Sequence, residues 1–307
     1  MIPRLLALAG LLAATPAAAR DAVVVLRSDD LPAYDAPIDA FSQAVGHPVQ
    51  VIGLRGDRAV ASRVAADLSR DPPPAVLALG AKAAWVAARE LPSTVPVVWA
   101  MVREPERYDL DGLNLTGVRM EIPPAMTLAQ FQLFAPDAVR LGILLSVSNS
   151  DPSVGRAIQA AREAGYTVIA RRVTSSRDVR RQLATMAREM DAIWLLPDPL
   201  VITPDHFHLV RALADRAHVP ILAYSETLVE AGAFMCVAPD RAAIGRLAAE
   251  RVRAVMEPGA TPASLAPIVP TDARVVLNRD AQQAAGLDID PALLDFVDEI
   301  VRERSDR

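Results

Sequence analysis

The sequence of 307 residues predicts an α/β protein in which parallel strands form open sheets with helices on both faces. Two observations predict this class. Short apolar runs alternate along the chain with longer segments whose apolar residues recur with helical period. Several of the short runs, such as residues 76–79 and 143–145, are apolar without interruption, which is typical of parallel strands buried on both faces.

The elements follow one another in a regular order. Strands are predicted at residues 22–27, 49–54, 75–79, 95–101, 141–145, 167–172, 192–196, 220–223 and 234–237. Helices are predicted at residues 37–45, 58–70, 82–90, 125–134, 153–164, 177–189, 205–217 and 241–257. Pro37 and Pro204 suit a first helical turn, because the N–H that proline lacks has no partner there.

A pattern of elements that occurs twice along the chain predicts two similar lobes. Residues 75–101 and 192–225 both give a strand, a turn, a helix and then Val-Pro before an apolar run. The two segments start roughly 120 residues apart, which is about the length of one domain. The stretch 108–124 falls where the first lobe should hand over to the second. Ligands of such sheets collect outside the carboxyl ends of the strands, so we expect a cleft there.

Composition and charge exclude several classes of function. Basic residues number 32 and acidic residues 37, which gives a net charge of −5 and argues against a nucleic-acid partner. Cys236 is the single cysteine, so neither an internal disulfide nor a thiolate zinc site is expected. His206 and His208 are too close in sequence to form the i, i+4 metal pair of a helix. We expect no metal and no cofactor.

The first nineteen residues are typical of a signal peptide. A positive start ending at Arg4 precedes an apolar run of about ten residues and an Ala-x-Ala ending at Ala19. The alternative, a buried N-terminal helix, is less favoured because Asp21 and a strand-like run follow at once. No cysteine follows for a lipid anchor. We expect an exported, soluble, periplasmic protein, cleaved after Ala19.

Several segments together resemble one known family. They are Val95-Pro-Val-Val-Trp-Ala-Met101, Asn114-Leu-Thr-Gly-Val118, Pro136-Asp-Ala-Val-Arg-Leu-Gly-Ile-Leu144, Ile193-Trp-Leu-Leu-Pro-Asp198, Val219-Pro-Ile-Leu222, Glu230-Ala-Gly-Ala233, and Val276-Leu-Asn278 through Ala285-Gly-Leu287. In order and spacing they resemble the ABC transporter substrate-binding family, whose better-known members bind aromatic amino acids. The resemblance covers roughly residues 22 to 291.

The resemblance implies the type I periplasmic-binding-protein fold, with two Rossmann-like lobes hinged around a central ligand cleft. It implies that the predicted helix 241–257 returns to the first lobe. Lobe 1 would then comprise residues 20–118 plus about 239–268, and lobe 2 residues 119–238 plus about 269–307. The chain departs from the family at Ser146-Val147, where relatives often have Tyr-Asn, at Ala81-Lys82, where they often have Ser or Thr, and at Asp198-Pro199, where they have Asp-Asn.

Candidate ligand contacts in lobe 1 follow the predicted strand ends; they are Ser28, Asp29, Tyr34, Gly80, Ala81, Lys82 and Met101. Gly80 to Lys82 end a strand and open a helix, where free N–H groups and the helix dipole suit an anion. We expect Lys82 to attract an anionic group of the ligand; the alternative is a solvated surface lysine. Asp29 would otherwise cap a helix or face water.

The candidates in lobe 2 are Ser146, Ser148, Asn149, Asp198, Ser225 and Glu226. Short hydroxyl and amide side chains can hydrogen-bond to a polar ligand, although they also suit ordinary turns. Asp198 and Glu226 could receive an ammonium or hydroxyl group through charge-assisted bonds. The alternative for Asp198, Ser225 and Glu226 is that they cap the helices that follow.

Four functions are considered for such a fold, and the first is favoured. The first is a monomeric, non-catalytic binding protein that delivers a small amino-acid-like carboxylate to an ABC permease. The second keeps the binding but acts on a sensor kinase. The third, an enzyme on a Rossmann-like fold, is disfavoured because the chain has no phosphate-binding glycine motif and no nucleophile elbow. A repressor of the same fold would need a DNA-binding head where the leader stands.

Overall fold

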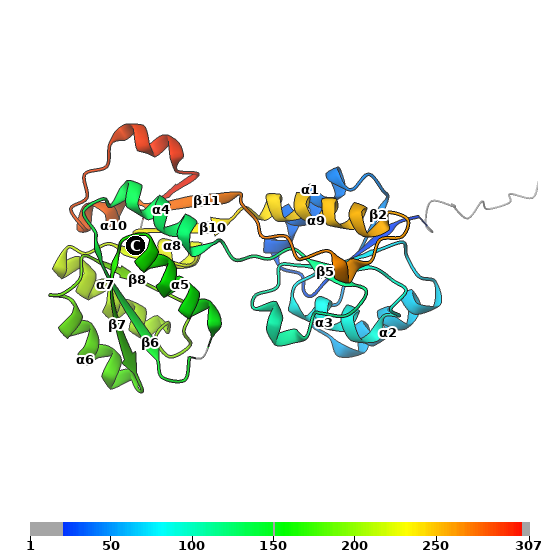
Figure 1. Cartoon of the computed structure of the whole chain (residues 1–307), viewed down its shortest axis with the longest axis horizontal. Coiled ribbons are helices and arrows are strands. Elements are labelled where there is room, and N and C mark those ends of the chain that lie inside the picture. Colours follow the sequence, from blue (N-terminus) through cyan, green and yellow to red (C-terminus); the bar gives the residue numbers. More distant parts are fainter. Residues whose placement is uncertain (1–20, 150, 303–307) are drawn as a thin grey trace, which may run out of the picture. The chain divides into compact units, whose positions relative to one another are not determined.

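The computed structural model describes residues 21–149 and 151–302 (Figure 1). The expected signal peptide, residues 1–19, lies outside the described residues. The chain divides into two compact units, each with its own sheet. Unit 1 contains the described residues up to Arg119 together with Arg241–Ile268. Unit 2 contains Met120–Asp240 and the described residues from Val269 onward.

Unit 1 is built on a five-stranded sheet in which every neighbouring pair is parallel. The strand order is β2-β1-β3-β4-β5. The strands are β1 (Val23–Arg27), β2 (Val49–Gly53), β3 (Val76–Leu79), β4 (Val97–Ala100) and β5 (Leu115–Gly117). All four residues of β3 and of β4 are buried, as the uninterrupted apolar runs predict for central parallel strands.

Helices cover both faces of this sheet (Figure 1). They are η2 (Pro32–Tyr34), α1 (Asp35–Ala44), α2 (Arg58–Arg70), α3 (Ala81–Glu90), η3 (Pro105–Tyr108), α9 (Arg241–Met256) and η4 (Pro262–Ser264). The late helix α9 packs on α1 from the start of the chain. Their backbones approach closely at Gly245, where an added Cβ would lie 2.2 Å from the carbonyl oxygen of Pro37. Glycine is therefore required at this crossing.

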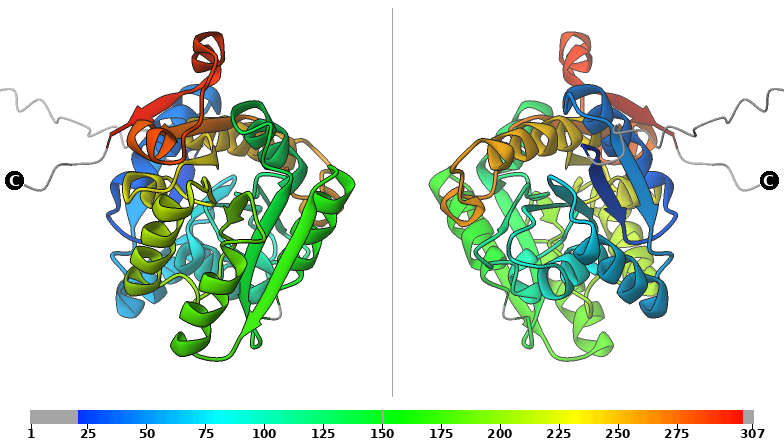
Figure 2. Two further views of the ribbon diagram at one scale, coloured as in Figure 1. Left: turned by 90° about the vertical axis from the view of Figure 1, so that its left-hand side faces the viewer. Right: turned by 90° about the vertical axis from the view of Figure 1, so that its right-hand side faces the viewer.

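Unit 2 is built on a seven-stranded sheet of order β12-β11-β10-β9-β8-β6-β7. The strands are β6 (Arg140–Ser146), β7 (Thr167–Val173), β8 (Ala192–Trp194), β9 (Ile221–Ala223), β10 (Met235–Pro239), β11 (Ala273–Asn278) and β12 (Glu299–Val301). The long strands β6 and β7 run side by side at one edge (Figure 2). Only β10 and β11 pair antiparallel among the described strands of this sheet.

Two layers of helices bury the two faces of the unit 2 sheet. The helices are α4 (Pro124–Phe134), α5 (Pro152–Glu163), α6 (Ser176–Met186), α7 (Pro204–Ala217), α8 (Glu226–Glu230), α10 (Arg279–Ala284) and η5 (Pro291–Phe296). The core under α4 and α5 contains the edge-to-face pair Phe131 and Phe234, with ring centroids 6.4 Å apart. The core on the other face is formed mainly by α6 and α7 against the sheet.

The predicted α/β class, with parallel-dominated sheets flanked by helices, is confirmed. Three strands were not predicted. β5 lies inside the stretch expected to be a connection, and Thr116 in it donates a hydrogen bond to the carbonyl of Leu265, 149 residues away. β11 and β12 add to the sheet after α9, and the antiparallel β10–β11 pair departs from a purely parallel order. None of the described helices is long and apolar enough to cross a membrane.

Candidate functional site

Several of the predicted contact residues lie at the carboxyl ends of the parallel strands in both units. In unit 1, Ser28 follows β1, Gly80 follows β3 and Met101 follows β4. In unit 2, Ser146 ends β6, and the loop containing Asp198 follows β8. The carboxyl ends of parallel strands lie at one edge of a sheet, where open α/β proteins bind ligands. Each unit therefore presents one candidate binding edge.

Ser28 ties the end of β1 to the start of α3. Its hydroxyl donates to the carbonyl of Leu79 at 2.9 Å and accepts the backbone N–H of Ala83 at 2.9 Å. The side chain is buried. Ser28 thus caps α3 from a distant part of the chain, and its hydroxyl is already occupied by bonds within unit 1.

Gly80 is a position that only glycine fits. Its φ of +85° and ψ of 164° lie in a region that other residues avoid. An added Cβ would lie 2.2 Å from the hydroxyl of Tyr34 and 2.7 Å from that of Ser28. Tyr34, Ser28 and Gly80 are therefore packed together at the opening of α3. Burial raises the pKa of the Tyr34 phenol, although the Ser28 hydroxyl acts in the opposite direction, so Tyr34 is a neutral hydroxyl at physiological pH.

The first turn of α3 presents open hydrogen-bond donors. The N–H of Ala83 is taken by Ser28, and that of Ala84 by the carbonyl of Gly80. Among the described residues, the N–H groups of Ala81 and Lys82 have no recorded acceptor. The helix dipole adds partial positive charge at this point, so the turn is suited to an anion.

Lys82 is exposed and reinforces that positive charge. Its Nζ would lie 2.9 Å from a Cβ added at Gly56, and Asp29 Oδ2 would lie 3.3 Å from the same point. Lys82 and Asp29 therefore both lie beside Gly56. In the described part of the chain, no carboxylate lies within 4.0 Å of the Lys82 ammonium group. Asp29 Oδ1 accepts the backbone N–H of Asp30 at 3.0 Å. The other Asp29 oxygen remains open to a donor.

Met101 follows β4 with a positive φ of 56° and is half-buried. A non-glycine residue in the left-handed region costs on the order of 1–3 kcal/mol and is found often at functional sites. No signal in the sequence indicates this conformation, because methionine has no preference for it.

Asp198 is the centre of the unit 2 edge, and it is only 3% exposed. Its Oδ2 accepts the backbone N–H of Ser146 at 2.7 Å, the hydroxyl of Ser146 at 2.9 Å and the amide of Asn149 at 3.0 Å. Its Oδ1 accepts the N–H groups of Leu200 at 2.9 Å and Val201 at 3.1 Å. The structure thus brings together three of the predicted residues, with both carboxylate oxygens bonded inside the unit.

These bonds decide the ionisation of Asp198. Burial acts to raise its pKa, but the hydrogen bonds from Ser146, Asn149 and Val201 together outweigh burial and lower it. Asp198 is therefore a carboxylate at neutral pH. It holds two loops in place, which agrees with the capping alternative as well as with a place at the binding edge.

Arg172 on β7 fixes the same loop from the other side. Its Nη1 donates to the carbonyl of Ser146 at 3.0 Å and to that of Asn149 at 3.3 Å. Asn149 also donates to the carbonyl of Pro197 at 3.1 Å, while Ser148 donates to the hydroxyl of Ser146 at 3.2 Å. Arg172 was not predicted, because an arginine on a half-exposed strand carries no pattern that distinguishes it from a solvated one.

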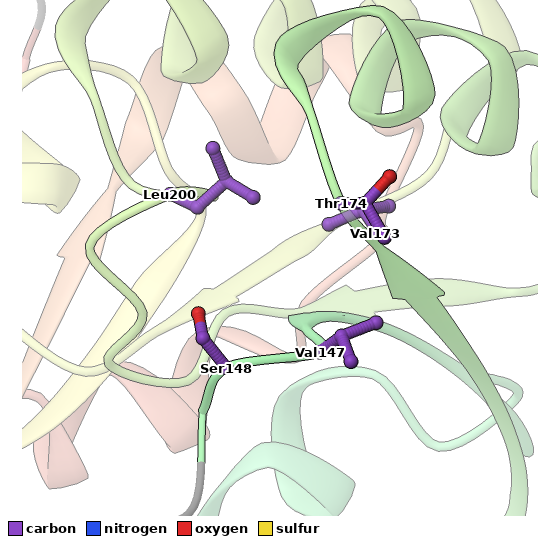
Figure 3. A pocket seen from close by; sticks show the side chains of 5 residues that line it. All are labelled: Val147, Ser148, Val173, Thr174 and Leu200. Carbon is purple, nitrogen blue, oxygen red and sulfur yellow. The ribbon is translucent and has the colours of Figure 1, made fainter.

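A pocket of about 270 Å³ lies at this edge (Figure 3). Its lining consists of Val147, Ser148, Val173, Thr174 and Leu200. Ser148 alone among them was predicted. The others come from three separate segments. The pairing of β6 with β7 brings Val147 to Val173, through a bond from the N–H of Val147 to the carbonyl of Val173 at 2.9 Å, and Asp198 holds the loop that contains Leu200.

Ser225 and Glu226 start the short helix α8 after β9, with Ser225 as N-cap but without a side-chain cap bond. The Glu226 carboxylate accepts from Arg274 Nη1 at 3.1 Å, and Arg274 Nη2 donates to Glu299 at 2.8 Å. Arg274, which was not predicted, thus connects α8 with β12. Its charge balances that of Glu226.

Two features of the remaining chain bear on chemistry. The described residues contain no cluster of His, Cys, Asp and Glu side chains that could hold a metal ion. Cys236 is fully buried, and burial raises the pKa of its thiol to about 12. A thiol with such a pKa is not a nucleophile at neutral pH.

Two α/β units, each with candidate contacts at the carboxyl edge of its sheet, form the type I periplasmic-binding-protein fold. The particular family follows from the sequence. The model of the family described as "ABC transporter substrate binding protein" matches residues 55–301. The chain belongs to this family, which is a family of solute-binding proteins and not of enzymes. Its members work with ABC transporters, typically outside the cytoplasm.

Individual relatives agree with this assignment. A "Tyrosine-binding protein" of Clostridioides difficile is 24% identical over 234 residues, which cover 74% of this chain and 66% of that protein. Among solved structures, a ligand-free, open substrate-binding protein with adhesive properties from Clostridium difficile has a TM-score of 0.77 at 18% identity, covering 92% of this chain and 100% of that one. A domain from Streptococcus pneumonia in complex with L-Trp has a TM-score of 0.60 at 22% identity, with the same coverage.

Proposed function

We propose that this chain is an exported, non-catalytic binding protein. It captures a small amino-acid-like carboxylate between its two units and delivers it to an ABC permease. Family membership supports the coupling to a transporter. The leader of residues 1–19 supports export to the periplasm. The permease and the solute are the expected partners, and the protein acts as a monomer.

The first turn of α3 is the feature that best supports a carboxylate ligand. Two backbone N–H groups, the helix dipole and the Lys82 ammonium provide positive charge at one place on the carboxyl edge of the unit 1 sheet. Charge-assisted hydrogen bonds are roughly twice as strong as neutral ones. Asp29, which like Lys82 lies beside Gly56, has an oxygen that can accept from an ammonium group of the same ligand.

Binding and closure are one event in this proposal. Each unit supplies part of the contacts, so the ligand stabilises the arrangement in which both sets are made. A micromolar affinity corresponds to roughly −8 kcal/mol, which a few charge-assisted bonds and burial of an apolar group can provide. The names of the relatives, which refer to tyrosine and to L-Trp, support an amino-acid-like ligand.

A thermal-shift screen tests this function. The purified protein is heated with single amino acids, small mono- and dicarboxylates and nucleosides. A compound that binds the folded state raises the melting temperature by mass action. We expect a shift with at least one amino acid or monocarboxylate, and calorimetry should then give its affinity with no turnover of the compound. A shift with nucleosides alone, or conversion of the compound, would contradict the proposal.

A further inference from the structure

We propose that the unit 2 pocket binds an uncharged, aliphatic side chain of the ligand and rejects an anionic one. The inference rests on the proposed function and adds the substrate class: a neutral amino acid with an aliphatic side chain.

The lining is mostly aliphatic. Three of its five lining residues, Val147, Val173 and Leu200, are aliphatic. The other two, Ser148 and Thr174, carry hydroxyl groups. In Figure 3 the side chains of Leu200 and Ser148 lie on one side of a common space, and those of Val147, Val173 and Thr174 lie on the other. Val147 is 60% exposed although it is apolar. An aliphatic group that covered it would remove that surface from water.

The two hydroxyls can accept hydrogen bonds in this pocket but have no hydrogen left to donate. The Ser148 hydroxyl donates to Ser146 Oγ, which in turn donates to Asp198 Oδ2. The Thr174 hydroxyl donates to Asp178 Oδ2. A serine or threonine carries a single hydroxyl hydrogen. The Ser148 hydrogen therefore points towards the Ser146 hydroxyl and the Thr174 hydrogen towards a carboxylate, so neither is left for a ligand.

A carboxylate would find no partner among these groups. It needs donors, and the side chains of the lining offer only acceptors and methyl groups, while the hydroxyls lead to two carboxylates, Asp198 and Asp178. The nearest cation in this network is Arg172, whose Nη1 bonds to the carbonyls of Ser146 and Asn149. Burying an anion without partners is costly, so the pocket excludes it. The hydroxyl acceptors tolerate an apolar group or a weak donor.

The walls are held before any ligand arrives. Asp198 fixes the end of β6 through Ser146 and the loop at Leu200 through the backbone N–H of Leu200. The Val147 N–H is bonded to the carbonyl of Val173. A site whose walls are fixed loses little conformational entropy on binding. The lining contains no ring and no cation, so an aromatic side chain gains no ring contact here.

Calorimetric titration of the full chain with L-leucine, L-glutamate and L-tyrosine tests the inference. We expect L-leucine to bind at least tenfold more tightly than L-glutamate, and no more weakly than L-tyrosine. Tighter binding of L-glutamate or of L-tyrosine would overturn the subsite assignment while the proposed function stood. If no amino acid or monocarboxylate bound at all, both the subsite assignment and the proposed function would be contradicted.

A charge placed in the pocket gives a second test. Val147→Lys supplies the missing cation, and we expect it to reduce the preference for L-leucine over L-glutamate at least tenfold. Val139→Lys is the matched control, because Val139 is a 54% exposed valine just before β6, at the opposite end of the strand. The control should keep the wild-type preference. An unchanged preference in Val147→Lys, with an unchanged melting temperature, would overturn the inference.

Discussion

The Asp198 carboxylate accepts the backbone N–H of Ser146 at 2.7 Å and so joins the loop after β8 to the end of β6, 52 residues earlier. Five hydrogen bonds converge on this one side chain, from Ser146, Asn149, Leu200 and Val201. Asp198 is therefore the residue on which the geometry of the unit 2 edge depends.

Asp198→Asn should destabilise the protein by about 3 kcal/mol, because an amide places hydrogens against donors that are buried. Urea denaturation measures the change. Asp205→Asn is the matched control, since Asp205 is an exposed aspartate in the first turn of α7, and it should change the free energy of unfolding by less than about 0.5 kcal/mol. Equal effects of the two changes would contradict the role of Asp198.

The contribution of Asp198 should depend on pH in a defined window. Its pKa is lowered in the folded protein, so its stabilisation is fully present above the unfolded value of about 3.9 and is lost as the pH falls through the lowered folded value. The stability difference between wild type and Asp198→Asn should be constant from about pH 5 to pH 8 and shrink below about pH 4. A difference that already disappears near pH 6 would show that the carboxylate is not held in this way.

Gly80→Ala should destabilise unit 1 and weaken ligand binding. The new methyl group would meet the Tyr34 hydroxyl at 2.2 Å, and the backbone conformation itself costs on the order of 1–3 kcal/mol for alanine. Gly155→Ala is the control. An added Cβ at Gly155, in the first turn of α5, has nothing within 4 Å, so this change should stabilise by up to about 0.5–1 kcal/mol.

A double variant separates the collision from the backbone strain. Tyr34→Phe removes the hydroxyl that the alanine would meet, so Gly80→Ala should cost less in the Tyr34→Phe background than in wild type. Thermal denaturation of the four proteins gives the coupling. Strict additivity would mean that Tyr34 and position 80 do not interact.

Lys82→Ala should weaken binding of the ligand about tenfold, or about 1.4 kcal/mol, because the ammonium group attracts the carboxylate. The loss should become smaller as salt is added, since salt screens exposed charges. Arg63→Ala, which removes an exposed cation from α2, controls for net charge. Wild-type affinity in Lys82→Ala would place Lys82 among the solvated surface residues.

The general architecture could be predicted because the alternation of strand and helix patterns is repeated many times along the chain. Uninterrupted apolar strands and intervening helices recur in both units, so a misplaced boundary changes little. β11 and β12 were missed because they follow the last predicted helix and fit no strand–helix alternation. β5 was missed because a strand of only three residues, Leu115–Gly117, carries too short a pattern.

The candidate site was predicted in part. Residues directly after strands, such as Ser28, Gly80 and Ser146, could be found because a parallel sheet gathers strand ends at one edge. The sequence could not tell that the polar groups of Ser28, Asn149 and Asp198 are bonded within their own unit, since hydrogen-bond partners lie about 50 residues away. Val173, Leu200 and Arg172 were missed for the same reason.

The most direct test is to measure the affinity of one ligand for four proteins: wild type, Lys82→Ala in unit 1, Val147→Lys in unit 2, and the protein with both changes. The ligand is the tightest-binding neutral amino acid from the thermal-shift screen, titrated by calorimetry. If one solute is held by both units, each single change weakens its binding and the double change weakens it further. If one of the single changes leaves the affinity at the wild-type value while the other abolishes binding, the solute is held by one unit alone and the account is wrong.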